Sequence, residues 1–385
     1  MILHLAAILS AWLQYEADGQ PHARVVGTTS CPTVAADERL LPMHARAGAI
    51  EGFNDIVCDV AIPATAKRVR IGQRTLPAPV ARLERIVVLG DTGCRINGLE
   101  LQNCNNPVDW PFPVIARSIT KLHPDLIVHV GDYLYRESAC PPFDTGCAGS
   151  PFGDIAQAWT ADWFAPAAPM LASAPVVLIR GNHEDCTRAG PGWFRYLDGG
   201  PATECEQISQ PYAVDFPGLR LVVFDSAGGD DLRIDGARLA EYKQTFSAAR
   251  KLTYNGPDDR WLITHRPPYL NNNERTAMGS TIHRFSAVLS GHIHLFAGLN
   301  VEGLPPLVIN GEGGDNLDTM LASVLTFGLG NLHSADAPFT EPRFGFGLYT
   351  RIPSGWLISL RNTTGNELAR CALTRRTVHC TAKAL

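Results

Sequence analysis

The sequence lacks a membrane-length apolar run and an excess of basic residues. A spanning helix needs about 20 consecutive apolar residues, and the longest candidate, the first 13 residues, falls well short. Lysine and arginine number 33 against 38 aspartates and glutamates, for a net charge of −5. The basic stripe that polymeric nucleic acid requires is therefore missing. We expect no transmembrane segment and no nucleic-acid polymer as a partner.

Zinc-knuckle spacing is also missing, because no neighbouring cysteines have the gap of two to four residues that such a site uses. The ten cysteines instead form five local pairs: Cys31/Cys58, Cys94/Cys104, Cys140/Cys147, Cys186/Cys205 and Cys371/Cys380. We interpret these pairs as disulfides, each contributing about 2–4 kcal/mol. They indicate an oxidising compartment, so we expect a secreted or periplasmic protein. Free thiols in a cytosolic enzyme are the alternative.

The chain contains no repeats and no low-complexity segment, and its length of 385 residues suggests about two domains. Residues 1–80 hold short β-like runs and end near the proline-containing "TLPAPVAR" (75–82). We predict a small β domain over residues 1–80 and a larger domain over residues 81–385. The first 13 residues resemble the apolar core of a signal peptide but lack its flanks. We expect a strand there, leading into the Asp18-Gly19 turn.

In the larger domain, apolar runs alternate with helical patterns, which predicts an α/β layered fold. The runs are rich in Val, Ile and Leu without polar alternation, as in strands buried on both faces. Five of them are "RIVVLGD" (85–91), "DLIVHVGD" (125–132), "APVVLIRGN" (174–182), "RWLITH" (260–265) and "FSAVLSGHIH" (285–294). A sixth, "LRLVVFDS" (219–226), ends on Asp225 without a matching motif. The segment 345–373 predicts antiparallel strands.

Each of the five runs stops on a side chain that can bind metal: Asp91, Asp132, Asn182, His265, and the pair His292 and His294. Ligands bind beyond the carboxyl ends of strands in such folds, so these side chains are expected at one rim. Carboxylate, amide and imidazole ligands together suit Fe, Mn or Zn. Two metals bridged by a carboxylate form a clamp for phosphoryl displacement.

At these residues the chain resembles the calcineurin-like metallophosphoesterase superfamily. The motifs "GDTG" (90–93), "GDYLY" (131–135), "GNHE" (181–184), "THRPPY" (264–269) and "GHIH" (291–294) occur in the family order. The resemblance implies a four-layer α/β (α+β) sandwich of two mixed β-sheets flanked by helices, after the small N-terminal β domain. It also implies a dinuclear metal-dependent hydrolase of phosphate esters.

One departure indicates the branch of the superfamily. Many members have a histidine two residues after the first aspartate, but this chain has Gly93. In purple acid phosphatases a tyrosine three residues after the second aspartate replaces that ligand, and Tyr135 matches it. A phenolate ionises at neutral pH only beside a strong Lewis acid, which favours Fe(III). A plain packing role for Tyr135 and ligation by Tyr133 remain alternatives.

The resemblance assigns the ligands to two sites. Site one, expected to hold Fe(III), comprises Asp91, Asp132, Tyr135 and His294. Site two, for a divalent Fe, Zn or Mn ion, comprises the bridging Asp132 with Asn182, His265 and His292. His183 resembles the catalytic histidine of the family, which protonates the leaving alkoxide or contacts the phosphoryl group; Asn182 and His183 would both contact the substrate.

The expected function is a purple acid phosphatase-like phosphomonoesterase in which a metal-bound hydroxide attacks phosphorus in a small phosphate ester. A phosphodiesterase acting on nucleotides or phospholipid head groups is one alternative, and an inactive metal-stabilised binding protein is another. "LNNNERTAMGS" (270–280) lacks the histidines that plant relatives carry there, which leaves the substrate range open. The oligomeric state is also open. Further candidates for the substrate pocket are His283, His333, Glu184, Arg188, Trp193 and Arg266.

Overall fold

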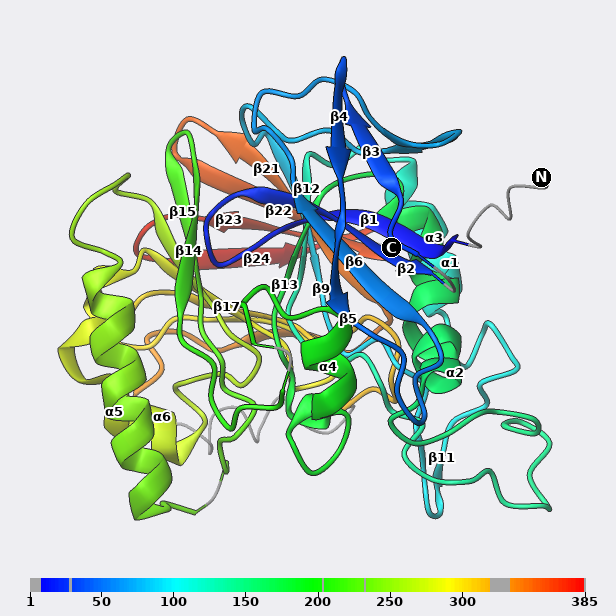
Figure 1. Cartoon of the computed structure of the whole chain (residues 1–385). Helices are drawn as coiled ribbons and strands as arrows, with labels where there is room; N and C mark the ends of the chain where they lie inside the picture. Colours follow the sequence, from blue (N-terminus) through cyan, green and yellow to red (C-terminus); the bar gives the residue numbers. More distant parts are fainter. Residues whose placement is uncertain (1–7, 28–29, 203, 232, 319–332, 384–385) are drawn as a thin grey trace, which may run out of the picture.

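The computed structural model describes residues 8–27, 30–202, 204–231, 233–318 and 333–383. Among these residues, two large mixed β-sheets face each other and helices flank them (Figure 1). The predicted architecture of two mixed sheets flanked by helices is therefore confirmed. Within the same ranges, no helix combines the length and the apolar character needed to cross a membrane.

The first sheet has eleven strands among the described residues. In spatial order they are β24 (Val378–Ala382), β23 (Glu367–Leu373), β22 (Gly355–Asn362), β21 (Gly345–Ile352), β9 (Arg85–Leu89), β12 (Leu126–His129), β13 (Val176–Leu178), β1 (Ile8–Tyr15), β2 (Pro21–Gly27), β6 (Ile56–Ala61) and β5 (His44–Ala47). The central strands β9, β12, β13 and β1 are parallel, and antiparallel strands extend the sheet on both sides. The predicted antiparallel strands of the segment 345–373 are confirmed as β21, β22 and β23.

The second sheet has seven strands in the part of the chain that the structure describes. Their order is β14 (Tyr212–Phe216), β15 (Leu219–Val223), β16 (Arg260–Ile263), β17 (Ala287–Ser290), β19 (Leu307–Asn310), β18 (Phe296–Leu299) and β20 (Phe339–Glu341). The strands β15, β16, β17 and β19 are parallel. All six apolar runs identified in the sequence therefore form strands.

Helices and short helical turns connect the strands of the two sheets. They are α1 (Phe112–Thr120), α2 (Ala156–Trp159), the π-helical turn η1 (Thr160–Phe164), α3 (Ala165–Leu171), the 3₁₀ turn η2 (Asn182–Glu184), α4 (Gly190–Tyr196), α5 (Gly236–Lys251), α6 (Asn272–Met278) and the 3₁₀ turn η3 (Gly279–Arg284). Figure 1 shows α1, α2 and α3 on one side of the molecule, and α5 and α6 on the other. Two small sheets complete the fold: β4 (Arg39–Pro42), β3 (Thr33–Ala36), β7 (Val69–Ile71) and β8 (Arg74–Leu76), and the hairpin β10 (Ile96–Asn97) with β11 (Glu100–Leu101).

The side chains of the central strands alternate between the two faces of each sheet. One face packs on the other sheet and the opposite face packs on helices, which gives four layers. Ile86 and Val88 of β9 belong to the core between the two sheets, which also contains Trp261 and Ile263 of β16. Val87 of β9 points the other way and packs with the helices of the α1 side. Because successive side chains alternate between faces and both faces are covered, every position must be apolar. This explains the unbroken apolar runs in the sequence.

The N-terminal strands join the first sheet directly. Gln14 of β1 is paired in parallel with Val176 of β13, and β1 and β2 form the hairpin expected around Asp18-Gly19. Strands on both sides of residue 80 therefore share a sheet, while the division into domains at that residue stays a prediction. Of the apolar N-terminal segment, the strand begins at Ile8, and residues 1–7 lie outside the described residues.

The five cysteine pairs expected from the sequence all form disulfides. They are Cys31–Cys58, Cys94–Cys104, Cys140–Cys147, Cys186–Cys205 and Cys371–Cys380. No cysteine is left free. The predicted pairing is confirmed, and the alternative of free thiols is not supported.

Candidate metal centre

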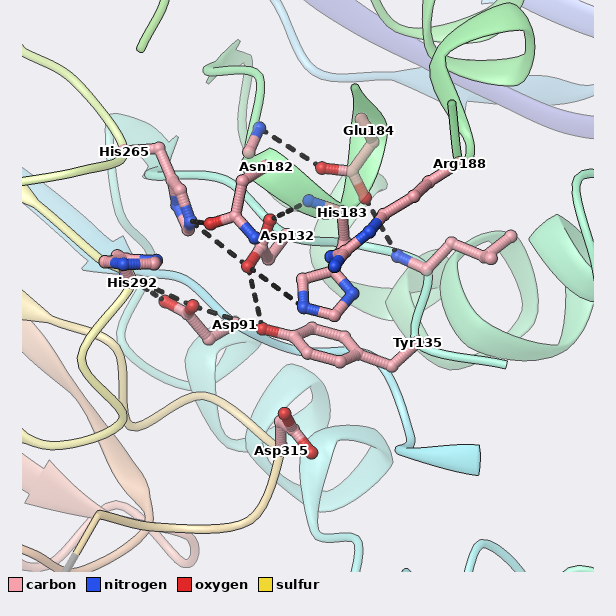
Figure 2. Close-up of polar contacts among 12 residues, drawn as sticks. Asp91, Asp132, Tyr135, Asn182, His183, Glu184, Arg188, His265, His292 and Asp315 are labelled. Carbon is pink, nitrogen blue, oxygen red and sulfur yellow. Dashed lines mark hydrogen bonds and ion pairs between the residues drawn. The ribbon is translucent and has the colours of Figure 1, made fainter. Parts of the chain in front are cut away.

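The eight predicted site residues lie together where strands of both sheets end. Asp91 and Asp132 follow β9 and β12, and Asn182 follows β13, all in the first sheet. His265 and His292 follow β16 and β17 of the second sheet. The two facing sheets thus each supply part of one cluster, and Figure 2 shows the side chains pointing toward a common centre.

Three of these residues adopt a backbone conformation that is unusual without glycine. Asp91, Asp132 and His292 have φ angles of 57°, 60° and 71°. This left-handed region is uncommon for residues other than glycine and tends to mark functional sites. At each of the three positions the chain turns sharply as it leaves a strand, which directs the side chain into the cluster.

Two glycines of the motifs are required because the chain segments approach closely. A Cβ atom on Gly131 would lie 2.4 Å from Nδ1 of His265. A Cβ atom on Gly181 would lie 2.0 Å from Oδ1 of Asp132. A side chain at either position would displace a predicted ligand, which gives the physical reason for the glycines in "GDYLY" and "GNHE".

The side chains of predicted site one meet at the hydroxyl of Tyr135. This oxygen lies 2.8 Å from Oδ2 of Asp132, 3.3 Å from Oδ1 of Asp91 and 3.1 Å from Nε2 of His294. Tyr135 is 1% exposed and Asp91 is fully buried. The rival Tyr133 points elsewhere, since its hydroxyl donates to the carbonyl of Ile179 at 3.0 Å. Of the two tyrosines, only Tyr135 therefore offers its oxygen to the cluster.

The side chains of predicted site two surround the other side of Asp132. Nε2 of His265 lies 3.1 Å from Oδ2 of Asp132 and 3.1 Å from Oδ1 of Asn182. Asp132, His265 and His292 each place a possible ligand atom within 4.8 Å of the others. Asp132 therefore has both sets within reach of its carboxylate, as a bridging ligand would require.

The donor set fits two metal ions. His265 holds one ring nitrogen, Nδ1, 2.8 Å from the carbonyl of Val130, and His294 holds Nδ1 2.8 Å from the carbonyl of Asn316. A histidine that donates from one nitrogen to a carbonyl keeps the lone pair of the other nitrogen for a metal. In both residues that other nitrogen, Nε2, faces the carboxylates of the cluster.

Electrostatics of the cluster also favour bound cations. Burial lowers the pKa of His265, but the charge of Asp132 and the contact with its carboxylate outweigh burial and raise the pKa to about 9. For His294 burial is likewise outweighed, by Asp315 and Asp91, and the pKa rises to about 10. Carboxylates that hold protons on buried imidazoles would also attract metal ions.

His183 stands beside the two ligand sets with one nitrogen anchored. Its Nδ1 lies 2.7 Å from Oε1 of Glu137, and its Nε2 lies 3.9 Å from Oδ2 of Asp132. Its ring packs on Tyr135 with 3.9 Å between ring centroids. Arg188 approaches the same oxygen of Glu137 at 3.6 Å. The sequence reasoning missed Glu137, because no motif marks a residue two positions after Tyr135.

Two buried carboxylates hold the loops that carry the ligands. Glu184 accepts the backbone N–H groups of Tyr133 at 2.8 Å and of Gly181 at 3.1 Å. Asp162 accepts the N–H of Tyr135 at 2.9 Å. Burial and the charge of Asp132 raise the pKa of Glu184 to about 8. Glu184 was a candidate for the substrate pocket. Its carboxylate instead binds the backbone of the loops that carry the predicted ligands.

The other candidates for the substrate pocket are scattered. Trp193 belongs to the hydrophobic core on the α1 side, and His283 lies in η3. The backbone carbonyl of His333 accepts the N–H of Glu302. Arg188 contacts Glu137, and Arg266 lies 2.9 Å from Nε2 of His292. Among these five candidates, the charged side chains of the two arginines are the ones that reach the cluster. Arg266 contacts His292 directly, and Arg188 contacts Glu137, the partner of His183.

Comparison with known proteins agrees with this geometry. The model of the family "Calcineurin-like phosphoesterase" matches residues 84–296, more than half of the chain. Purple acid phosphatase 23 of Arabidopsis thaliana is 22% identical over 265 residues. That match covers 63% of this chain and 53% of the plant protein, so the chain spans about half the length of this relative.

Two solved structures share the fold at low sequence identity. The purple acid phosphatase PPD1 from yellow lupin (Lupinus luteus) seeds superposes with a TM-score of 0.60 at 14% identity, over 94% of this chain and 73% of that one. PhoD superposes with a TM-score of 0.59 at 10% identity, over 98% of this chain and 92% of that one. Both comparisons concern the fold.

Proposed function

Because the chain belongs to the calcineurin-like phosphoesterase family, in its purple acid phosphatase-like branch, we propose that it is a metal-dependent phosphoric ester hydrolase that cleaves small phosphomonoesters. The proposal rests mainly on the hydroxyl of Tyr135, which lies within 3.3 Å of Asp91, Asp132 and His294. A buried tyrosine that served only for packing would not require two carboxylates and an imidazole around its oxygen.

We assign Asp91, Asp132, Tyr135 and His294 to the first metal ion, and Asp132, Asn182, His265 and His292 to the second. A tyrosinate ligand favours Fe(III) in the first position, and a divalent Fe, Zn or Mn ion suits the second. When bound, the two ions would supply positive charge to the phosphoryl oxygens and would make water more acidic.

His183 is proposed as the general acid. Glu137 accepts a hydrogen bond from Nδ1, which fixes the orientation of the ring and directs Nε2 toward the cluster. In the imidazolium form that acts as the acid, both ring nitrogens carry a proton. A proton held at Nε2 can then pass to the leaving oxygen of the ester. The stacked ring of Tyr135 limits rotation of the imidazole. Arg188, 39% exposed in its side chain, adds positive charge beside Glu137.

The compartment is part of the proposal. All ten cysteines are paired in five disulfides, and such bonds persist in oxidising environments. We place the protein outside the cell or in the periplasm. The expected substrate there is a small phosphate ester that reaches the cluster by diffusion.

The test compares hydrolysis of an aryl phosphate monoester with that of the matching diester, using the intact protein with its metals. We expect faster cleavage of the monoester. His183→Ala should lower kcat by roughly 10²–10⁴-fold, the usual contribution of a general acid, while the metal content stays the same. Preferential cleavage of the diester would replace the monoesterase proposal with a phosphodiesterase. No turnover on either ester with both metals present would favour a binding protein.

A further inference from the structure

The loop that follows the sixth apolar run, β15, also reaches the cluster. Asp225, at its start, accepts a hydrogen bond from Arg180 at 3.1 Å, two residues before Asn182. The hydroxyl of Ser226 accepts the backbone N–H groups of His265 at 3.2 Å and of Arg266 at 2.8 Å. The carboxyl end of this strand therefore lies at the same rim as the five others, although no motif marks it.

Further along the same loop, Asp231 contacts His292. Its Oδ2 lies 2.9 Å from Nε2 of the imidazole. The same oxygen accepts a hydrogen bond from Nη1 of Arg266, whose side chain is 11% exposed. The side chain of His292 is 20% exposed and that of Asp231 is 40% exposed. Asp231, the most exposed of the three, therefore contacts both Arg266 and the predicted ligand His292.

This contact decides which nitrogen of His292 remains for a metal. Nε2 lies 2.9 Å from Oδ2 of Asp231 and also 2.9 Å from Nη1 of Arg266, which itself donates to the same oxygen. The carboxylate is the only hydrogen-bond acceptor of the two, so a proton on Nε2 is held by Asp231, and the lone pair is then on Nδ1. His265 and His294 show the opposite arrangement, because each holds Nδ1 against a carbonyl and turns Nε2 inward. His292 also differs from these two histidines in its backbone, because its own φ angle is 71°.

We propose that Asp231 is a positioning residue that orients His292 to bind the second metal ion through Nδ1. The inference rests on the proposed function, since it presupposes a two-metal centre. Arg266 has a defined part in this arrangement. Its guanidinium shares Oδ2 of Asp231 with the imidazole, which keeps the carboxylate oriented as a hydrogen-bond acceptor beside His292. Asp231 thus acts on the metal through the imidazole rather than as a ligand.

A matched ion pair elsewhere in the fold separates this role from simple stabilisation. Asp215 of β14 accepts hydrogen bonds from Arg220 of β15 at 2.6 Å through both oxygens, and its side chain is 56% exposed. This pair lies at the start of β15, whereas Asp231 follows its end. Asp231→Asn and Asp215→Asn each remove one carboxylate charge from an aspartate–arginine pair, but only the first pair contacts a histidine of the cluster.

The experiment uses the full-length protein loaded with Zn²⁺ and equilibrated with graded concentrations of EDTA. Metal retained per chain is then measured by elemental analysis. In Asp231→Asn, one of the two ions should be lost at a roughly 10–100-fold lower EDTA concentration than in the wild type. This is the usual effect of removing the hydrogen-bond partner of a metal-binding histidine. The other ion should be retained as in the wild type, and Asp215→Asn should match the wild type for both ions.

Retention of both ions by Asp231→Asn at wild-type EDTA concentrations would overturn the inference while leaving the two-metal centre intact. A wild-type chain that binds no Zn²⁺ would overturn the proposed metal centre and the inference with it. Long-range ¹H–¹⁵N NMR of the Zn²⁺-loaded, ¹⁵N-histidine-labelled wild type needs no variant. It should show His292 protonated on Nε2, and a proton on Nδ1 would overturn the inference.

Discussion

Tyr135 combines two contacts that a single substitution can separate. Its ring packs on His183, and its hydroxyl is surrounded by Asp91, Asp132 and His294. Burial and the charge of the two aspartates raise the pKa of this phenol well above its ordinary value. Ionisation therefore requires a strong Lewis acid at the oxygen.

Tyr135→Phe should keep the packing and remove the oxygen. We expect loss of the broad visible charge-transfer band of a tyrosinate–Fe(III) pair and a fall in iron per chain, measured by absorption spectroscopy and elemental analysis. Tyr133→Phe is the control, because that hydroxyl donates only to backbone carbonyls. It should keep the band and cost about 1 kcal/mol of stability. A colourless wild-type protein that binds two Zn or Mn ions would rule out the Fe(III) assignment.

At the scale of elements, the segments after β9, β12 and β13 carry predicted ligands and also one cysteine each of three disulfides, namely Cys94, Cys140 and Cys186. Cys94 lies three residues after Asp91, and its N–H donates to Asp162 at 3.3 Å. Asp162 also holds the N–H of Tyr135. The disulfide Cys94–Cys104 therefore closes a loop whose backbone is connected to two predicted ligands. Rigid support of this kind maintains the geometry of a site.

Removing that disulfide should loosen the metal centre before the fold is lost. The double variant Cys94→Ala/Cys104→Ala is expected to lower metal per chain after dialysis, while far-ultraviolet circular dichroism keeps the wild-type shape. Cys371–Cys380 joins β23 to β24 at the edge of the first sheet and is the matched control. Its removal should leave metal content unchanged. Equal metal retention in both double variants would show that the loop does not depend on its disulfide.

For the whole molecule, a buried ionic cluster fastens the N-terminal strands to the rest. Arg24 of β2 is fully buried and forms ion pairs with Glu16 and Asp59. Its Nη1 donates to the carbonyls of Tyr196, the last residue of α4, and of Asp198 just after it, at 3.0 and 2.8 Å. His22, 12% exposed in its side chain, lies 2.6 Å from Asp59 and 3.0 Å from Asp18.

This cluster predicts a stability that falls with rising pH. Burial lowers the pKa of His22, but Asp59 and Glu16 outweigh it and raise the pKa to about 9, above about 6.5 for an unfolded histidine. A raised folded pKa stabilises the protein below pH 6.5, and this stabilisation is lost as pH rises through 9. The pKa of Glu16 is raised to about 7 by burial, so its contribution also favours the folded state at low pH and is lost as pH rises toward 7, largely below the pH range in which His22 loses its proton. Asp59 stays ionised throughout, since its pKa is lowered.

Urea denaturation at pH 6.5 and at pH 9 measures the effect. The wild type should lose on the order of 2 kcal/mol more than His22→Gln between the two pH values, after allowing for solvent screening. Subtracting the variant removes contributions from other titrating groups. An equal pH dependence in the two proteins would show that His22 does not hold a proton in this cluster.

The sequence by itself determined the strands, the disulfides and the identity of the clustered residues. Strands buried on both faces must be apolar throughout, so they were visible as runs, and the side chains at their ends were visible as motifs. Cysteine pairs close in sequence limited the choice of partners. Eight clustered residues were identifiable because each follows such a run: Asp91, Asp132, Tyr135, Asn182, His183, His265, His292 and His294.

Only the tertiary structure decided which groups support these residues. Glu137 and Asp231 lie in loops and Asp162 in the short turn η1, and the partners of the three residues are 27 to 61 positions away. Local patterns carry no information on such contacts, because they depend on where the two sheets place their loops. For the same reason, the pairing of β1 with β13 was not foreseen. The sequence therefore identified the proposed metal ligands, and the packing of the two sheets determined how their side chains are oriented.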